Sequence, residues 1–205
     1  MKEHLARLQD PDPYVRQKAA EALGKMGTAA ATPEVLGALI QRLREDAAWV
    51  VRSEAAEVLG EMGTAAATPE VLGALLERLR EDAAKWVRWA AAVALGVMGK
   101  AAARPEVLRS LVQCLREDED GGVRQKAVWA LGEMREAAAT PEVLGALLER
   151  LREDEDWRVR YEAAVALGEM GKAAATPEVI EALVERLRKD KYKVVRQAAA
   201  GALGR

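Results

Sequence analysis

The sequence predicts an all-α fold: an α-solenoid of six stacked helical hairpins, about twelve helices in total, with a 36-residue period. Three observations predict it. The chain of 205 residues is rich in Ala, Leu, Glu and Arg, which favour helix, while aromatic residues make up only 4% and Phe is absent. One block of sequence recurs along the chain, and inside each block the apolar residues follow the helical spacing of three and four.

The repeat accounts for almost the whole chain. Full copies start at residues 32, 68, 104 and 140, and the blocks that start at 32 and 140 are identical at 27 of 36 positions. A partial copy precedes residue 32, and the copy that starts at residue 176 is shorter. We therefore expect a single repeat domain spanning residues 1–205, with the units 1–31, 32–67, 68–103, 104–139, 140–175 and 176–205.

Each unit is expected to contain two helices. The first opens with Thr-Pro-Glu, in which Thr suits the N-cap, Pro fits the first helical position and Glu complements the positive helix end. The second ends at a Gly suited to a left-handed cap, Gly63 in the second unit. In that unit the predicted core stripes are Leu36, Leu39, Ile40 and Leu43 in the first helix and Val51, Ala55, Leu59 and Met62 in the second.

Two further features recur in all six units. A Leu-Gly pair lies inside each second helix, and because Gly there costs about 1 kcal/mol relative to Ala, its recurrence predicts close approach of a neighbouring helix. A Val-Arg pair also recurs, with an Asp six residues before its Arg. If each Asp pairs with the Arg that follows it, replacing Arg88 with Ala would leave Asp82 without its partner and destabilise the fold.

The pattern D-x5-R with V-R-x-x-A-A-x-A-L-G, as in Asp154 through Gly168, resembles the short HEAT-like repeats of bilin-lyase-type proteins. It is also similar to engineered HEAT-like libraries and to the repeat tails of some bacterial signalling NTPases. The resemblance covers essentially the whole chain. It implies a right-handed solenoid, an Asp–Arg ladder that links adjacent repeats, and a concave face formed by the second helices. One departure is Arg135, which stands where the other units have a capping Gly.

Composition limits the classes of function. A formal net charge of −2 does not fit a general binder of nucleic acid or anionic membranes. The single cysteine, Cys114, cannot form an internal disulfide, and no signal peptide or apolar run of membrane-spanning length is present, so we expect a cytoplasmic protein. His4 is the only histidine and has no metal-ligating partners, while Cys114 is expected on an accessible helix flank with no adjacent base. No catalytic residue, metal or cofactor is predicted.

The units differ from one another mainly on one face of the second helix. This face carries every tryptophan, with Lys, Gln and Ser at the same positions in other units, a mixture that a buried core would not tolerate cheaply. The alternative is that the rings pack between repeats. We predict that the face binds a partner through Tyr14, Gln17, Lys18, Trp49, Val50, Ser53, Glu54, Glu57, Lys85, Trp86, Trp89, Val93, Gln125, Lys126, Trp129, Trp157, Arg158, Tyr161 and Val165.

The leading interpretation is a non-catalytic scaffold that binds a protein or peptide, natural or engineered. Acidic and basic residues on the variable face are nearly balanced, which argues against a track for phosphates. A homodimer through two aromatic faces is also compatible with the sequence. The remaining alternatives are a subunit of a bilin-lyase-like enzyme, as the resemblance permits, and a purely structural spacer.

Overall fold

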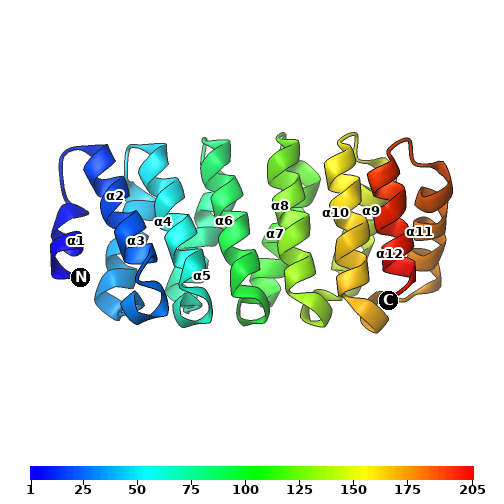
Figure 1. Cartoon of the computed structure of the whole chain (residues 1–205), viewed down its shortest axis with the longest axis horizontal. Helices are drawn as coiled ribbons and strands as arrows, with labels where there is room; N and C mark the ends of the chain where they lie inside the picture. Colours follow the sequence, from blue (N-terminus) through cyan, green and yellow to red (C-terminus); the bar gives the residue numbers. More distant parts are fainter. The chain divides into compact units, whose positions relative to one another are not determined.

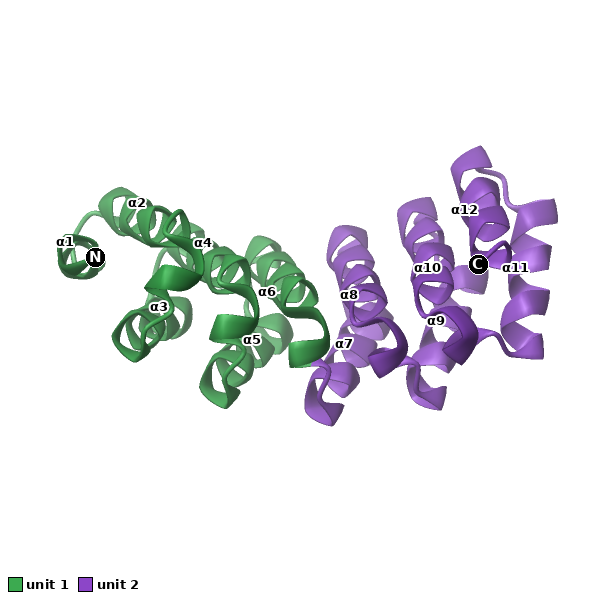
Figure 2. Cartoon of the chain, turned by 60° about the horizontal axis from the view of Figure 1, so that its bottom comes forward, with its two compact units in different colours: residues 1–102 green, residues 103–205 purple.

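A computed structural model describes all residues, 1–205, and confirms the all-helical fold. It contains twelve α-helices, α1 to α12, and five short 3-10 helices, η1 to η5, and no strand (Figure 1). The helices form two compact units, Met1–Ala102 and Ala103–Arg205 (Figure 2), which are described separately. The division falls within one residue of the predicted boundary between the third and fourth repeats.

Both units consist of helical hairpins. The helices of unit 1 are α1 (Lys2–Arg7), α2 (Pro13–Gly24), α3 (Pro33–Glu45), α4 (Trp49–Glu61), α5 (Pro69–Glu81) and α6 (Lys85–Met98), with η1 (Gly27–Ala30), η2 (Gly63–Ala66) and η3 (Gly99–Ala102). Those of unit 2 are α7 (Pro105–Glu117), α8 (Gly121–Glu133), α9 (Pro141–Glu153), α10 (Trp157–Glu169), α11 (Pro177–Lys189) and α12 (Lys193–Leu203), with η4 (Arg135–Ala138) and η5 (Gly171–Ala174).

Within each unit the helices form two layers. The second helices α2, α4 and α6 pack side by side in unit 1, as do α8, α10 and α12 in unit 2 (Figure 2). The first helices α3 and α5, and likewise α7, α9 and α11, form the other layer. The apolar stripes meet between the layers: Leu39 and Leu43 of α3 and Val51, Ala55 and Leu59 of α4 are fully buried. Each buried Leu or Val contributes about 1.5–3 kcal/mol relative to exposure, so stacking supplies most of the stability.

The predicted caps of the first helices are present. The hydroxyl oxygen of Thr32 accepts a hydrogen bond from the backbone N–H of Val35 at 3.3 Å, and Pro33 occupies the first turn. Thr68, Thr140 and Thr176 cap α5, α9 and α11 in the same way. Arg104, which replaces Thr before α7, makes no such side-chain bond.

The recurrent helical glycines lie at helix–helix contacts. A methyl group placed on Gly60 of α4 would lie 2.7 Å from Cα of Ala94 in α6. The corresponding distances are 3.1 Å from Gly132 to Ala166 and 3.0 Å from Gly168 to Ala202. The second helices therefore approach one another so closely that a side chain at these positions would force the neighbouring helix to shift, as the Leu-Gly repeat predicts.

The Asp–Arg ladder links adjacent repeats, as the family resemblance implies. Arg16 donates from Nε to Asp46 Oδ2 at 2.6 Å and from Nη2 to Asp46 Oδ1 at 2.7 Å. The same bidentate contact joins Arg52 to Asp82, Arg124 to Asp154 and Arg160 to Asp190. In each case the Asp is located 30 residues after the Arg, in the next repeat.

The predicted pairing of each Asp side chain with the Arg six residues later is therefore wrong. The carboxylate of Asp82 receives Arg52, whereas Arg88 donates from Nη1 to the backbone carbonyl of Asp82 at 2.9 Å. The six-residue spacing suits a contact between the guanidinium and the carbonyl of its own repeat. Replacing Arg52, not Arg88, is the change that removes the bidentate partner of Asp82.

Two other positions bear on the sequence expectations. Arg135 has a φ of 54°, in the left-handed region that the equivalent Gly27, Gly63, Gly99 and Gly171 also adopt, so the chain keeps the same turn with an unsuitable residue. Cys114 is 8% exposed, which corrects the prediction of an accessible flank. Its small, weakly polar thiol occupies a buried position on α7.

Candidate binding clefts

The predicted binding residues all lie on second helices. In unit 1 they are Tyr14, Gln17 and Lys18 on α2, Trp49, Val50, Ser53, Glu54 and Glu57 on α4, and Lys85, Trp86, Trp89 and Val93 on α6. In unit 2 they are Gln125, Lys126 and Trp129 on α8, and Trp157, Arg158, Tyr161 and Val165 on α10.

The aromatic rings on this face differ in exposure. Tyr14, Trp49 and Trp86 are exposed at 63%, 45% and 51%, which is high for side chains of this size. Trp89, Trp129, Trp157 and Tyr161 are half-buried. The variable face is thus part solvent-facing and part packed.

Ser53 shows that variation among repeats is not a reliable sign of exposure. It is 8% exposed, and its hydroxyl lies 3.4 Å from the carbonyl oxygen of Trp86 and 3.3 Å from Oε1 of Glu57. A small polar residue is tolerated here because either acceptor can take the single hydrogen of the hydroxyl.

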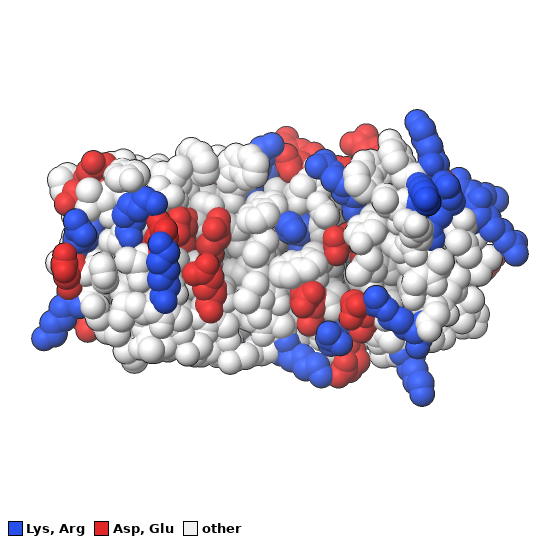
Figure 3. All heavy atoms as spheres, viewed as in Figure 1, with Lys and Arg blue, Asp and Glu red and all other residues white.

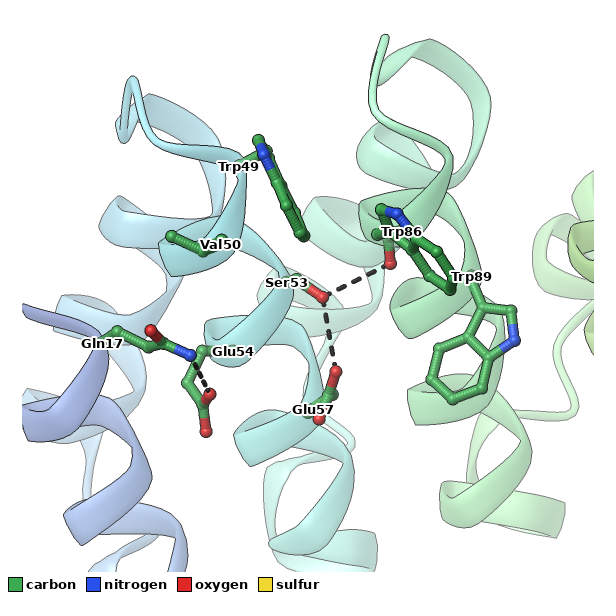
Figure 4. Close-up of a pocket in the computed structure, with 8 residues that line it drawn as sticks. All are labelled: Gln17, Trp49, Val50, Ser53, Glu54, Glu57, Trp86 and Trp89. Carbon is green, nitrogen blue, oxygen red and sulfur yellow. Dashed lines mark hydrogen bonds between the residues drawn. The ribbon is translucent and has the colours of Figure 1, made fainter. Parts of the chain in front are cut away.

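Unit 1 contains a cleft, here called the tryptophan cleft, of about 340 Å³ between α2, α4 and α6 (Figure 4). All the residues that line it belong to the predicted binding set: Gln17, Trp49, Val50, Ser53, Glu54, Glu57, Trp86 and Trp89. Its volume falls at the lower end of the range for ligand pockets, which suits one side chain or a small group.

The ladder helps to position the walls of this cleft. Asp46 Oδ1 accepts the backbone N–H of Ala48 at 3.0 Å, immediately before Trp49 begins α4. Asp82 Oδ1 accepts the backbone N–H of Ala84 at 2.9 Å, two residues before Trp86 in α6. The carboxylates that join the repeats therefore also fix the turns that place both indoles in the first turn of their helices.

Two glutamates of α4, Glu54 and Glu57, also line the cleft, and in the view of Figure 4 they lie below Trp49 and Trp86. Gln17 donates from Nε2 to Glu54 Oε2 at 3.1 Å, which links α2 to α4. Burial is the main cause that raises the pKa of Glu54, and the charges of Glu21 and Glu61 raise it further, against the hydrogen bond from Gln17 and the charge of Lys18. Burial and then the charge of Glu54 likewise raise the pKa of Glu57.

A second cleft of about 340 Å³ lies in unit 2, here called the C-terminal cleft. It is lined by Tyr161, Val165, Val194, Gln197, Ala198, Gly201, Ala202 and Arg205. Four of these residues stand three 36-residue periods after residues of the tryptophan cleft. Tyr161 and Val165 correspond to Ser53 and Glu57, and Val194 and Gln197 correspond to Trp86 and Trp89. The other four lining residues of each cleft do not correspond, and the C-terminal cleft has no carboxylate in its lining and includes an arginine.

The two clefts share part of their frame. Gln125 donates to Glu162 at 3.3 Å in unit 2, which repeats the bond from Gln17 to Glu54. The ring of Trp157, equivalent to Trp49, stacks on Tyr192 with 5.5 Å between centroids and is absent from the cleft lining. One indole position thus serves as a cleft wall in unit 1 and as a packing residue in unit 2.

Sequence reasoning missed the part of the C-terminal cleft that comes from α12. Of its lining, only Tyr161 and Val165 were predicted. Val194 and Gln197 could have been found from the 36-residue period, since they occupy the variable positions of the sixth unit, whereas Arg205 gave no signal beyond its charge.

Charge on the face is mixed. On the side drawn in Figure 3, acidic and basic side chains lie next to each other over unit 1, and no continuous basic band is visible. No group of three or more His, Cys, Asp or Glu side chains is arranged to hold a metal ion. None of the helices combines the length and apolar character needed to span a membrane.

The fold and the repeat define a class: an α-solenoid built from helical hairpins. The family model for HEAT repeats matches residues 2–60, 36–132 and 108–204, so the chain belongs to the HEAT repeat family. No curated protein sequence matches it significantly.

Solved structures share the fold at low sequence identity. One chain, from a structure describing microtubule plus-end tracking by XMAP215, CLIP-170 and EB1, is 18% identical with a TM-score of 0.62, over 100% of this chain and 90% of that chain. Human deoxyhypusine hydroxylase in complex with glycerol is 20% identical with a TM-score of 0.51, over 98% and 82%. A chain of the CpcE–CpcF phycocyanin lyase from Nostoc sp. PCC7120 is 21% identical with a TM-score of 0.46, over 98% and 92%.

Proposed function

We propose that this HEAT repeat chain is a non-catalytic scaffold that binds a protein or peptide through the aromatic face of its second helices. The observation that carries the proposal is the tryptophan cleft, in which exposed Trp49 and Trp86 flank a cavity lined wholly by residues that vary among the repeats. Exposed tryptophans beside a concave site are typical of binding hot spots.

The charge of the face favours a protein or peptide over nucleic acid. Lys18 is neutralised by Glu21 at 2.6 Å, and Arg158 by Asp156 at 2.6 Å. A nucleic-acid track needs cations whose charge is available to phosphates, and these two are already paired.

The non-catalytic part of the proposal rests on the residues available for chemistry. A catalytic site built on histidine or cysteine would need these side chains close together, yet the single His4 lies in α1 and the single Cys114 is buried in α7. The hydroxylase and the lyase among the structural neighbours are similar in fold, and their activities are not carried over to this chain.

The proposal can be tested with a displayed peptide library selected against the immobilised full chain, followed by calorimetry on the enriched peptides. The variant Trp49→Ser with Trp86→Ser is expected to weaken binding by about ten-fold or more, because it removes both exposed indoles. A matched control is Ile180→Ser with Leu187→Ser, which removes two exposed apolar side chains from α11 and should leave the affinity unchanged.

Failure to enrich any peptide, or equal affinity in the tryptophan variant, would contradict the proposal. Light scattering over a range of concentrations separates self-association from binding of a different partner. A dimer that the tryptophan variant dissolves would mean that the face joins two copies of this chain.

A further inference from the structure

We propose that the tryptophan cleft takes the positively charged side chain of a lysine or arginine from a bound peptide. This inference rests on the proposed function and specifies the chemistry of the partner. Three observations support it: the indoles that line the cleft, the two carboxylates that line it, and the contrast with the C-terminal cleft in unit 2.

The walls suit a cation. The faces of indole rings attract ammonium and guanidinium groups that come within about 6 Å of the ring centroid. Trp86 already makes such a contact inside the protein, since Nζ of Lys85 lies 5.2 Å from its ring centroid. Trp49 and Trp86 both line the cleft, so an entering cation would have two indoles to contact.

Glu54 and Glu57 supply the opposite charge. Only one oxygen of each glutamate accepts a hydrogen bond, from Gln17 to Glu54 and from Ser53 to Glu57. Neither carboxylate has a lysine or arginine within 4.0 Å, although Lys18 acts on Glu54 from a longer distance. The second oxygen of each carboxylate is therefore available to an entering N–H donor, and charge-assisted hydrogen bonds of this kind are the stronger ones.

The cations around the cleft have other partners. Lys18 and Lys25 of α2 both bind Glu21 at 2.6 Å, and Arg52 of α4 binds Asp82. Desolvation raises the pKa values of Glu54 and Glu57, and so do the charges of nearby glutamates: Glu21 and Glu61 for Glu54, Glu54 and Glu61 for Glu57. A ligand cation would relieve this repulsion, whereas an anion would add to it.

The C-terminal cleft shows that shape alone does not imply a cation site. It has the same volume, but Val165 replaces Glu57, Val194 replaces Trp86 and Gln197 replaces Trp89. Its lining also includes Arg205, whose guanidinium pairs with Glu169. The two clefts share four positions of the repeat, and only the tryptophan cleft combines indoles with carboxylates in its lining.

The test uses three blocked tripeptides on the full chain, Gly-Lys-Gly, Gly-Arg-Gly and Gly-norleucine-Gly, with the indole N–H signals followed by NMR. The lysine and arginine peptides are expected to shift the signals of Trp49 and Trp86 saturably and to leave that of Trp157 unmoved. The norleucine peptide, which has a similar apolar stem and no charge, is expected to bind at least about ten-fold more weakly.

A charge variant sharpens the test. Glu54→Gln with Glu57→Gln keeps the shape of the side chains and should weaken the lysine peptide by about ten-fold or more. Glu34→Gln with Glu45→Gln makes the same change in net charge at exposed sites of α3 and should have little effect. Thermal melts verify that both variants are folded.

Any one of three results would overturn the inference. The norleucine peptide binds as tightly as the lysine peptide, the α3 control loses as much affinity as the cleft variant, or the signals of Trp49 and Trp86 do not shift. The proposed function would survive that result if displayed peptides without lysine or arginine still required the two indoles. If displayed peptides also bind equally well without the two indoles, the proposed function is contradicted as well.

Discussion

Arg52 and Asp82 form a two-point contact between adjacent repeats, with Nε 2.7 Å from Oδ2 and Nη2 2.8 Å from Oδ1. The side chain of Asp82 is only 1% exposed and that of Arg52 is 14% exposed. The same pair of groups holds the stack together and, through the turn at Ala84, places Trp86 beside the cleft. The stability of the stack and the geometry of the cleft therefore depend on the same ion pair.

Removing Arg52 should be strongly destabilising. We expect Arg52→Ala to lower the free energy of unfolding by about 3 kcal/mol, because it leaves a buried carboxylate without its guanidinium. Arg44→Ala is the matched control: it breaks an inter-repeat pair with Glu77 at 3.1 Å whose side chains are 43% and 34% exposed, and should cost less than about 1 kcal/mol. Urea denaturation of both variants checks this, and equal midpoints would contradict the role of the ladder.

Acid should weaken the same contacts. Burial would raise the pKa of Asp82, but the hydrogen bonds from Arg52 and Ala84 and the charges of Arg52 and Arg78 outweigh it and hold the pKa below the ordinary 3.8. A group with a lowered pKa contributes stability that is complete above its unfolded value and is lost as pH falls through the folded value. We expect a steep fall in melting temperature below about pH 4. In Asp82→Asn the fall should be shallower, and an unchanged slope would argue against this cause.

Glu54 of the tryptophan cleft and Glu162 of α10 act in the opposite direction. Burial is the main cause of the raised pKa of Glu162, as of Glu54, so protonation as pH drops toward the ordinary 4.5 favours the folded state. The melting temperature should thus increase slightly from pH 7 toward pH 5 before the aspartates are protonated. Glu162→Gln should flatten that increase, and thermal melts at several pH values would show it.

Glycines in the two helix layers should respond differently to alanine. Gly60→Ala places a methyl group against the backbone of Ala94 and should destabilise by about 1–3 kcal/mol. Gly73→Ala, in α5, meets no atom within 4 Å and should stabilise by about 0.5–1 kcal/mol through helix propensity. Denaturation midpoints that move in the same direction for both would contradict the close approach of α4 and α6.

Arg135 offers a stabilising substitution. A non-glycine residue in the left-handed region is strained by about 1–2 kcal/mol, and the equivalent turns all use Gly. Arg135→Gly should therefore stabilise by about 1 kcal/mol, after loss of an exposed pair with Glu169 at 3.7 Å that contributes little. Gly63→Ala tests the same turn in reverse and should destabilise. A lower melting temperature in Arg135→Gly would count against strain at this turn.

The sequence predicted the hairpins and the caps well because each depends on local spacing that recurs, and the Leu-Gly repeat predicted the close approach of helices from neighbouring repeats. It failed where the identity of a partner in the neighbouring repeat had to be chosen. The partner of Asp82 was misassigned because Arg52 and Arg88 stand at equivalent positions, and only the stacking decides between them. Burial of Ser53 was missed for the same reason, since its neighbour Trp86 lies in the next repeat.

Transferring the lining of one cleft to the other would test the binding chemistry most directly. Val165→Glu with Val194→Trp gives the C-terminal cleft the residues that Glu57 and Trp86 provide in unit 1. Because Val165 is half-buried and Val194 is 40% exposed, both substitutions should be accommodated without loss of the fold. The substituted cleft should then bind the lysine tripeptide more tightly than the norleucine tripeptide, as shown by a shift of the indole signal introduced at residue 194. The single variant Val194→Trp is the control: an indole without the carboxylate should bind both peptides weakly and alike. If the single variant distinguishes the lysine from the norleucine tripeptide as well as the double variant does, the carboxylate is not what selects a cation.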